Sequence, residues 1–120
     1  MQERKEKEQS LDIQPFNFDD YQDAVARFAV HLPYDKALMH GVLGLGGESG
    51  EILEKFKKQI RDGTPVSDDD LDKELGDVLW YIAYLCTIRH LRLGDIALKN
   101  YKKLADRQQR GVLGGSGDNR

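Results

Sequence analysis

The chain has 120 residues, which is enough for one compact domain and too few for two ordinary ones. The formal net charge of −3 provides no basic field to attract nucleic acid, and no run approaches the roughly 20 apolar residues of a membrane-spanning helix. Because the first ten residues are polar and Cys86 is the single cysteine, we expect neither a signal peptide nor a disulfide framework, and hence a cytoplasmic protein with a buried, inert thiol.

The amino-terminal part of the sequence predicts a flexible segment over residues 1–16, followed by a helix that begins near Asn17 or Asp19. Either residue can accept hydrogen bonds from the free N–H groups of the first turn. Pro33 ends this predicted helix because proline cannot continue the backbone hydrogen bonding. Its apolar residues recur at helical spacing: Tyr21, Val25, Phe28 and Ala29.

A second helix is predicted from about Asp35 to Asp62, with an apolar stripe made of Leu38, Val42, Leu45, Ile52 and Phe56. Glycine costs about 1 kcal/mol relative to alanine inside a helix, so the glycines of this segment need a reason. They are Gly41, Gly44, Gly46, Gly47 and Gly50. Two explanations remain open: the close approach of a neighbouring helix or ligand, or a break in the helix over residues 41–47.

The second half of the chain predicts two further helices. Gly63-Thr64-Pro65 stops the preceding helix, and Ser67 caps the next one, which runs to about His90. A last helix begins near Gly94-Asp95 and ends before Gly111, leaving a glycine-rich tail over residues 111–120. We expect no β-strand. The sequence therefore predicts an all-α, four-helix, bundle-like domain over residues 17–110, whose small core is completed by oligomerisation.

Two pairs of carboxylates occupy matching positions on the second and third predicted helices. Glu48 and Glu51, like Glu74 and Asp77, are three residues apart, so each pair lies within about 60° on one helical face. In both helices the apolar stripe lies beside that face. A hairpin that joins the two apolar stripes brings all four carboxylates together, whereas two unrelated acidic faces in solvent leave them apart.

Converging carboxylates repel one another unless a proton or a cation neutralises them. A hard divalent cation such as Mg2+ takes oxygen ligands and keeps positions for water and phosphate, and the sequence offers little His or Cys for zinc. Lys55 and Lys58 lie farther along the helical face that carries Glu48 and Glu51. Tyr81 and Tyr84 lie farther along the face that carries Glu74 and Asp77. Tyr81 is placed to stack on a base or ribose, and Trp80 fits either the core or a contact to the base.

The last predicted helix carries a polar stripe made of Asn100, Lys103, Arg107 and Arg110. If this stripe lies opposite a carboxylate–metal cluster, its cations and its amide can bind a polyphosphate. The alternative interpretation is a basic helical face that is exposed to solvent.

The residues around these carboxylates resemble the MazG-like, all-α nucleoside triphosphate pyrophosphohydrolases. The matching segments read GLGGESGEILEKFKK and DKELGDVLWYIAYL, and the segment N-x-x-K-L-x-x-R from Asn100 to Arg107 resembles the last helix of the family. The family signature is E-E-x-x-E, a spacer and E-x-x-D, and here Gly47 stands in place of the first Glu. The ligand set that the resemblance implies is Glu48, Glu51, Glu74 and Asp77.

The resemblance implies Mg2+-dependent hydrolysis of a nucleoside triphosphate between its α and β phosphates, with Mn2+ able to substitute. The products are a nucleoside monophosphate and pyrophosphate, and family members form dimers or tetramers and often remove non-standard or surplus nucleotides. Glu48 or Glu51 would orient the attacking water as a base. The expected substrate-binding residues are Lys55, Lys58, Tyr81, Asn100, Lys103 and Arg107.

Two other functions remain open. A phosphoribosyl-ATP pyrophosphohydrolase shares the fold and reaction type, although the Asn100 helix and the glycine-rich tail fit the MazG-like group better. A non-enzymatic helical dimer that binds metal or nucleotide is the other alternative. For the tail itself, a flexible end competes with a lid in which the glycines form an anion-binding nest and Arg120 contacts phosphate.

Overall fold

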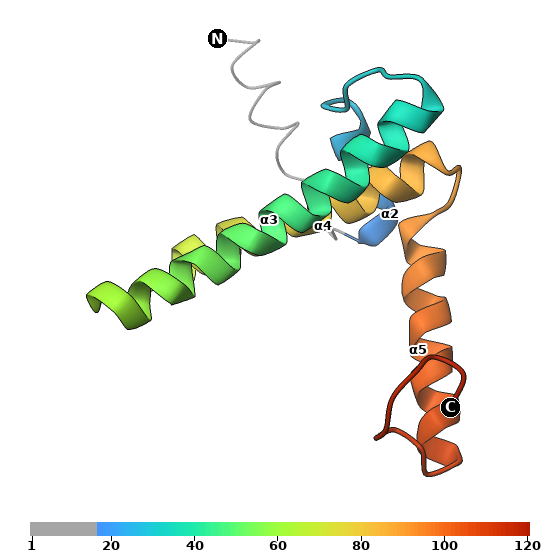
Figure 1. The fold of residues 1–120 in the computed structure, drawn as a ribbon. Helices are drawn as coiled ribbons and strands as arrows, with labels where there is room; N and C mark the ends of the chain where they lie inside the picture. The colour runs from blue at the N-terminus through green and yellow to red at the C-terminus, as the bar shows by residue number, and fades with distance from the viewer. Residues whose placement is uncertain (1–16) are drawn as a thin grey trace, which may run out of the picture.

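The computed structural model describes residues 17–120, and the flexible segment expected over residues 1–16 lies outside them. The described chain is all helical and contains no strand (Figure 1). Its helices are α2 (Phe18–Ala26), α3 (Tyr34–Asp62), α4 (Asp68–Ile88) and α5 (Leu93–Gln109). The predicted all-α class with four helices is therefore confirmed. None of these helices combines the length and the apolar character that a membrane span requires.

Helices α3 and α4 form a hairpin because the connection between them carries strong stop and start signals. Gly63 ends α3 in the left-handed region, at φ +73°, and its N–H donates to the carbonyl of Gln59 at 2.9 Å. Ser67 begins α4 by accepting a hydrogen bond from the N–H of Asp70 at 3.1 Å. The acidic first turn of α4 complements the positive end of the helix dipole.

The glycines of α3 do not break it, since one continuous helix spans them. Two of them permit the close approach of α4. A Cβ atom added at Gly41 would lie 2.6 Å from Cδ2 of Leu85, and one added at Gly44 would lie 2.5 Å from Cδ1 of Tyr81. The break considered over residues 41–47 is therefore wrong, and close approach accounts for these two positions. Around Gly46, Gly47 and Gly50, no heavy atom of the described residues meets such a Cβ within 4 Å.

Helix α2 is shorter than predicted, because it ends at Ala26 and not at Pro33. The chain leaves the helix through a turn in which the N–H of Phe28 donates to the carbonyl of Val25 at 2.9 Å. Phe28, expected on the apolar face, is 73% exposed. The physical reason is that the chain must cross from the end of α2 to the start of α3, where Pro33 precedes the first helical residue.

The amide of Gln22 joins α2 to the beginning of α5. This side chain is buried, donates to Thr87 Oγ1 at 3.2 Å and to the carbonyl of Leu91 at 2.8 Å, and accepts from the N–H of Leu93 at 2.7 Å. Asp19 Oδ1 accepts from the N–H of Gly94 at 3.1 Å. Side chains of α2 therefore cap α5, which has no capping side chain of its own.

The described chain buries little apolar surface. Its core cluster consists of Ala83, Cys86 and Leu93, against which Tyr21 and Val25 of α2 pack. Cys86 is buried as expected, and burial raises the pKa of its thiol. Helix α5 contacts α2 and α4 but not α3, and it stands away from the hairpin (Figure 1). The radius of gyration is 18.2 Å, against about 14 Å for a compact chain of this length.

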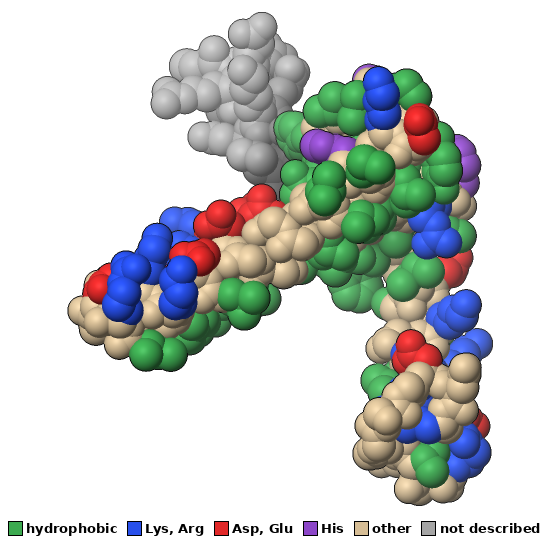
Figure 2. Space-filling view, in the orientation of Figure 1, with side chains coloured by type: hydrophobic (Ala, Val, Ile, Leu, Met, Phe, Trp, Pro, Cys, Tyr) green, Lys and Arg blue, Asp and Glu red, His purple; other side chains and the backbone are tan. Residues whose placement is uncertain are grey.

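Exposed apolar side chains continue along the hairpin and α5, and Figure 2 shows them gathered where the helices meet and along one edge of the hairpin. Those on α3 include Met39, Val42, Leu43, Leu53 and Ile60, and those on α5 include Ile96, Leu98, Tyr101 and Leu104. A core that is completed by oligomerisation stays a prediction, and this surface is what such an assembly would bury.

Candidate active site

Three carboxylates from α3 and α4 converge. Glu48, Glu74 and Asp77 each offer an oxygen, and these oxygens all lie within 4.8 Å of one another. Glu74 and Asp77 are three residues apart on one face of α4, and the hairpin brings Glu48 of α3 across to them. Glu48 and Glu74 are partly buried, whereas Asp77 is exposed.

Glu51 does not belong to this close group and its side chain is exposed. It still acts on the site through its charge. Partial burial raises the pKa of Glu48, and the neighbouring carboxylates of Asp77, Glu74 and Glu51 raise it further, in that order. The charge of Glu48 is thus coupled to those of the other three predicted carboxylates, two of which lie in the close group and one outside it.

The close group fits a hard divalent cation. Its donors are all carboxylate oxygens, which match Mg2+ or Mn2+ better than zinc, and no His or Cys joins it among the described residues. Burial and then the neighbouring carboxylates raise the pKa of Glu48, and a bound cation relieves the repulsion among these carboxylates. The exposure of Asp77 leaves the group open to solvent on one side.

Lys55 lies beside the carboxylates and Lys58 lies farther along α3. The Nζ of Lys55 is 3.5 Å from Glu74 Oε1, so this lysine partly neutralises the cluster. Both lysines line a surface depression near the turn of the hairpin, together with Thr64, Pro65, Val66 and Asp70. The structure therefore brings Lys55 to the predicted site and puts Lys58 at its edge.

Tyr81 lies one turn beyond Asp77 on α4, against Gly44 of α3. Its ring contacts three other aromatic rings. The centroid distances are 4.9 Å to Trp80, 6.0 Å to His40 and 6.5 Å to Tyr84. The sequence analysis did not single out His40 and missed its place beside Tyr81. The signal in the sequence was that His40 lies one helical turn before Gly44, so both residues lie on the same face of the helix.

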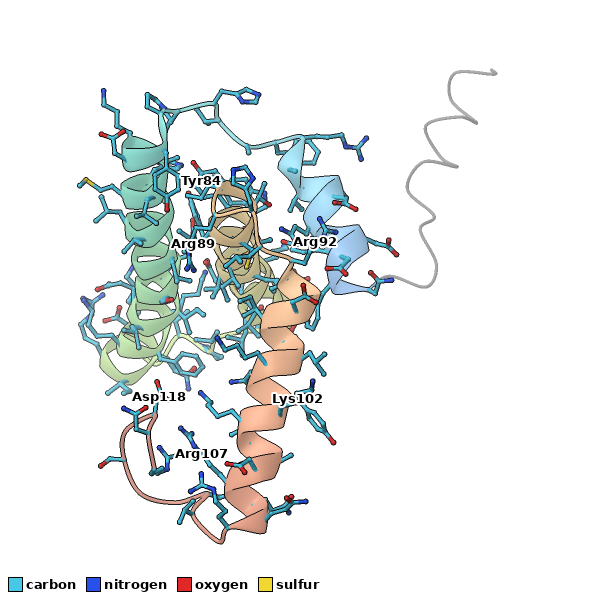
Figure 3. All side chains as sticks on the ribbon, turned by 90° about the vertical axis from the view of Figure 1, so that its right-hand side faces the viewer. Tyr84, Arg89, Arg92, Lys102, Arg107 and Asp118 are labelled. Carbon is cyan, nitrogen blue, oxygen red and sulfur yellow. The ribbon has the colours of Figure 1, made fainter. Side chains whose placement is uncertain are left out.

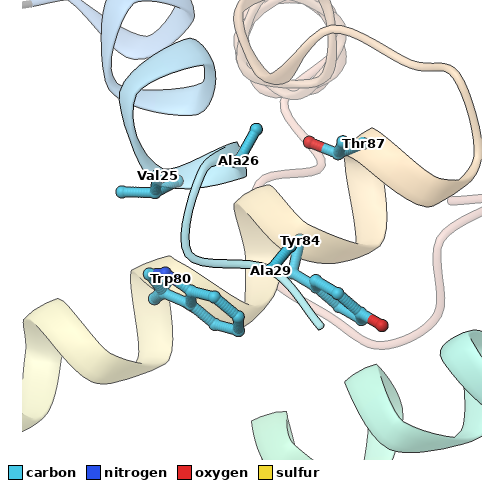
Figure 4. A pocket seen from close by; sticks show the side chains of 6 residues that line it. All are labelled: Val25, Ala26, Ala29, Trp80, Tyr84 and Thr87. Carbon is cyan, nitrogen blue, oxygen red and sulfur yellow. The ribbon is translucent and has the colours of Figure 1, made fainter. Parts of the chain in front are cut away.

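Trp80 belongs to the packing between α2 and α4. Its indole stacks on Tyr84, with ring centroids 5.4 Å apart and planes inclined by 13°. The two rings line a hollow with Val25, Ala26, Ala29 and Thr87 (Figure 4). The centre of a water molecule can move within a volume of only about 10 Å³ in this hollow. The hollow therefore holds one water at most and cannot hold a nucleobase.

The predicted polar stripe on α5 does not face the carboxylates within one chain. Asn100 is exposed, while Lys103 and Arg107 are bound by the segment that follows α5. Their partner is Asp118, which sequence reasoning did not single out (Figure 3). Because α5 makes no contact with α3, these cations and the carboxylate cluster belong to separate parts of the described surface.

Comparison with known proteins gives two matches. Residues 38–112 match the family model of the MazG nucleotide pyrophosphohydrolase domain. The Gene 37 protein of Mycobacterium phage L5 is 45% identical over 89 residues, which cover 71% of this chain and 78% of that protein. No solved structure matches the chain.

Proposed function

This chain belongs to the MazG nucleotide pyrophosphohydrolase family, and from that membership we propose that it cleaves nucleoside triphosphates to nucleoside monophosphates and pyrophosphate with the help of Mg2+. The observation that carries the proposal is the convergence of Glu48, Glu74 and Asp77 oxygens within 4.8 Å of one another. A carboxylate cluster of this kind, on two antiparallel helices, is suited to hold a divalent cation next to a polyphosphate.

The carboxylates divide into two roles. Glu48, Glu74 and Asp77 would hold the cation, which when bound would neutralise phosphate charge and lower the pKa of a water in the site. Glu51 is close enough to raise the pKa of Glu48 but stands outside the close group, so its carboxylate is free to orient a water and accept its proton. The water oxygen bonds to the α-phosphorus, the bond from that phosphorus to the α–β bridging oxygen breaks, and pyrophosphate leaves.

The substrate is held by side chains around this cluster. Lys55 is near enough to move from Glu74 to a phosphate oxygen, and Lys58 extends the positive surface along α3. Tyr81, between the carboxylates and the other aromatic rings, provides a face for the base or ribose. The choice of base and sugar is left to experiment.

The active form is a homo-oligomer, a dimer or a tetramer, in which α5 of one subunit brings Asn100, Lys103 and Arg107 to the carboxylates of another. Two observations support this arrangement. The apolar faces of α3 and α5 are exposed in the single chain, and α5 contacts no part of α3. The basic stripe of α5 is also complementary in charge to the acidic cluster on the hairpin.

Pyrophosphate release from a panel of canonical and modified nucleoside triphosphates tests the activity. We expect turnover with Mg2+ or Mn2+, no turnover in excess EDTA, and a large loss in Asp77→Asn and Glu51→Gln. The matched control is Asp69→Asn, an exposed carboxylate of α4 that pairs with Lys73 at 2.7 Å and lies outside the close group. Full turnover in EDTA, or no pyrophosphate from any triphosphate with either metal, contradicts the proposal.

Subunit complementation tests the assembly. Asp77→Asn disables the carboxylate cluster, and Lys103→Gln disables the basic stripe. If the site combines both from different subunits, mixing the two inactive variants under exchange conditions restores part of the activity, since some mixed assemblies carry one intact site. A monomer in light scattering at micromolar concentration, or no recovery after proven exchange, contradicts shared sites.

A further inference from the structure

The segment after α5 folds back onto Lys103 and Arg107, two of the expected substrate-binding residues. Arg107 Nη2 donates to the carbonyl of Asp118 at 2.8 Å and lies 3.3 Å from its Oδ1, and it also contacts the carbonyl of Gly117 at 3.4 Å. Lys103 Nζ lies 3.3 Å from the same Oδ1. Arg107 is only 3% exposed as a result. In Figure 3, Asp118 on the loop and Arg107 on α5 lie on facing parts of the chain.

This segment, residues 110–120, is a closed loop tied together by two further arginines. Arg110 Nη2 donates to the carbonyl of Arg120 at 2.8 Å. The guanidinium of Arg120 donates to the carbonyls of Val112 at 3.2 Å and Leu113 at 3.0 Å, and to that of Gly117. Gly115 and Gly117 have positive φ, as the turns of the loop require. Arg120 therefore closes its own loop and is not directed at an external anion.

The oxygens of the loop accept from the donors that a phosphate on Lys103 and Arg107 would use. The Asp118 carboxylate accepts from both Lys103 and Arg107, and the carbonyl groups of Gly117 and Asp118 accept from Arg107. A phosphate group also presents only acceptors, so it cannot join them on the same N–H donors without repulsion. Hydrogen bonds from Lys103 and then Arg107 lower the pKa of Asp118, which keeps its carboxylate charged at neutral pH.

We propose that residues 110–120 form an autoinhibitory latch, in which the Asp118 carboxylate takes the position of a substrate phosphate on Lys103 and Arg107 until a polyphosphate displaces it. This inference rests on the proposed function only in that it treats these two cations as phosphate ligands. The ion pair of Asp118 with Lys103 is weak, because the two side chains are 84% and 38% exposed and exposed ion pairs contribute little. A triphosphate that carries several charges can therefore replace it.

Binding of inorganic tripolyphosphate to the full chain, measured by calorimetry without divalent metal, tests the latch. Asp118→Asn removes the charge and keeps the shape, and we expect it to bind tripolyphosphate about twofold to fivefold more tightly, the factor that an exposed ion pair provides. The matched control is Asp95→Asn, an exposed carboxylate in the first turn of α5, at the opposite end of the helix from the loop. Lys103→Gln should weaken binding in both backgrounds.

A second measurement reads the loop directly. In the wild-type chain, saturating tripolyphosphate should move the amide NMR signals of Gly115 and Gly117 towards those of an unstructured peptide. The latch is contradicted if Asp118→Asn binds tripolyphosphate no more tightly than the wild type, since Asp118 then serves to position the cations. It is also contradicted if Lys103→Gln leaves binding unchanged. Neither result depends on pyrophosphate release, so a failure of the proposed activity is distinguished from a failure of the latch.

Discussion

The distance between α3 and α4 beside the carboxylate cluster depends on the missing side chain of Gly44. In Gly44→Ala the new Cβ would lie 2.5 Å from Cδ1 of Tyr81 and closer still to its Cε1 and Cζ. Carbon atoms pack best at about 3.5–4.0 Å, so the ring of Tyr81 must move by about 1 Å or more. We expect this substitution to destabilise the hairpin and to displace Tyr81 from the candidate site.

The magnitude follows from two opposed contributions. Replacing a helical glycine by alanine stabilises a helix by about 1 kcal/mol, and overpacking a well-packed contact costs about 1–3 kcal/mol. Gly44→Ala should therefore change the free energy of unfolding by between zero and about −2 kcal/mol. Gly76→Ala in α4 is the matched control, because no heavy atom lies within 4 Å of its added Cβ. It should be about 1 kcal/mol more stable than the wild type.

Thermal denaturation at one fixed protein concentration compares the two variants, since the stability of an oligomer depends on concentration. A difference of 1 kcal/mol corresponds to about 4–8 °C in a domain of this size, so Gly44→Ala should melt at least about 4 °C below Gly76→Ala. If Tyr81 contacts the substrate, the KM of Gly44→Ala should also rise, while that of Gly76→Ala stays the same. A Gly44→Ala variant as stable as Gly76→Ala would refute the reasoning.

Three other predictions concern buried and charged groups. Gln22→Leu leaves the N–H of Leu93 and the carbonyl of Leu91 without their partner, so it should cost about 2–4 kcal/mol in chemical denaturation; a loss under 1 kcal/mol would contradict this role. The hydroxyl of Tyr84 is buried without a hydrogen-bond partner among the described residues, so Tyr84→Phe should be neutral or stabilising by about 1 kcal/mol, and clear destabilisation would show that the hydroxyl has another partner. The pKa of Asp118 is lowered below its ordinary value of 3.8, so its contribution to loop stability is present above about pH 4 and is lost as the pH falls through the lowered pKa. The amide signals of the loop should therefore shift more on acidification in the wild type than in Asp118→Asn, and equal shifts in the two chains would contradict the pairing.

The sequence alone determined where most helices begin and end, because these limits depend on local chemistry. Gly63 can adopt a positive φ and Ser67 can cap a helix in almost any context, and both do so here. The spacing of Glu74 and Asp77 put them on one face for the same local reason. The end of α2 was predicted less well, since it depends on where the chain must cross to reach α3 and not on the periodicity of Phe28.

Only the tertiary structure decided which faces meet. A helical wheel treats Glu48 and Glu51 alike, but the position at which α4 crosses α3 brings Glu48 into the close group and leaves Glu51 outside it. The same crossing puts Tyr81 against Gly44, which decides between the two explanations that the sequence left open for this glycine. Periodicity identifies the residues that share a face, whereas their partners are set by the packing of segments distant in the sequence. For that reason the stripe of Lys103 and Arg107 was visible in the sequence, and its pairing with Asp118 was not.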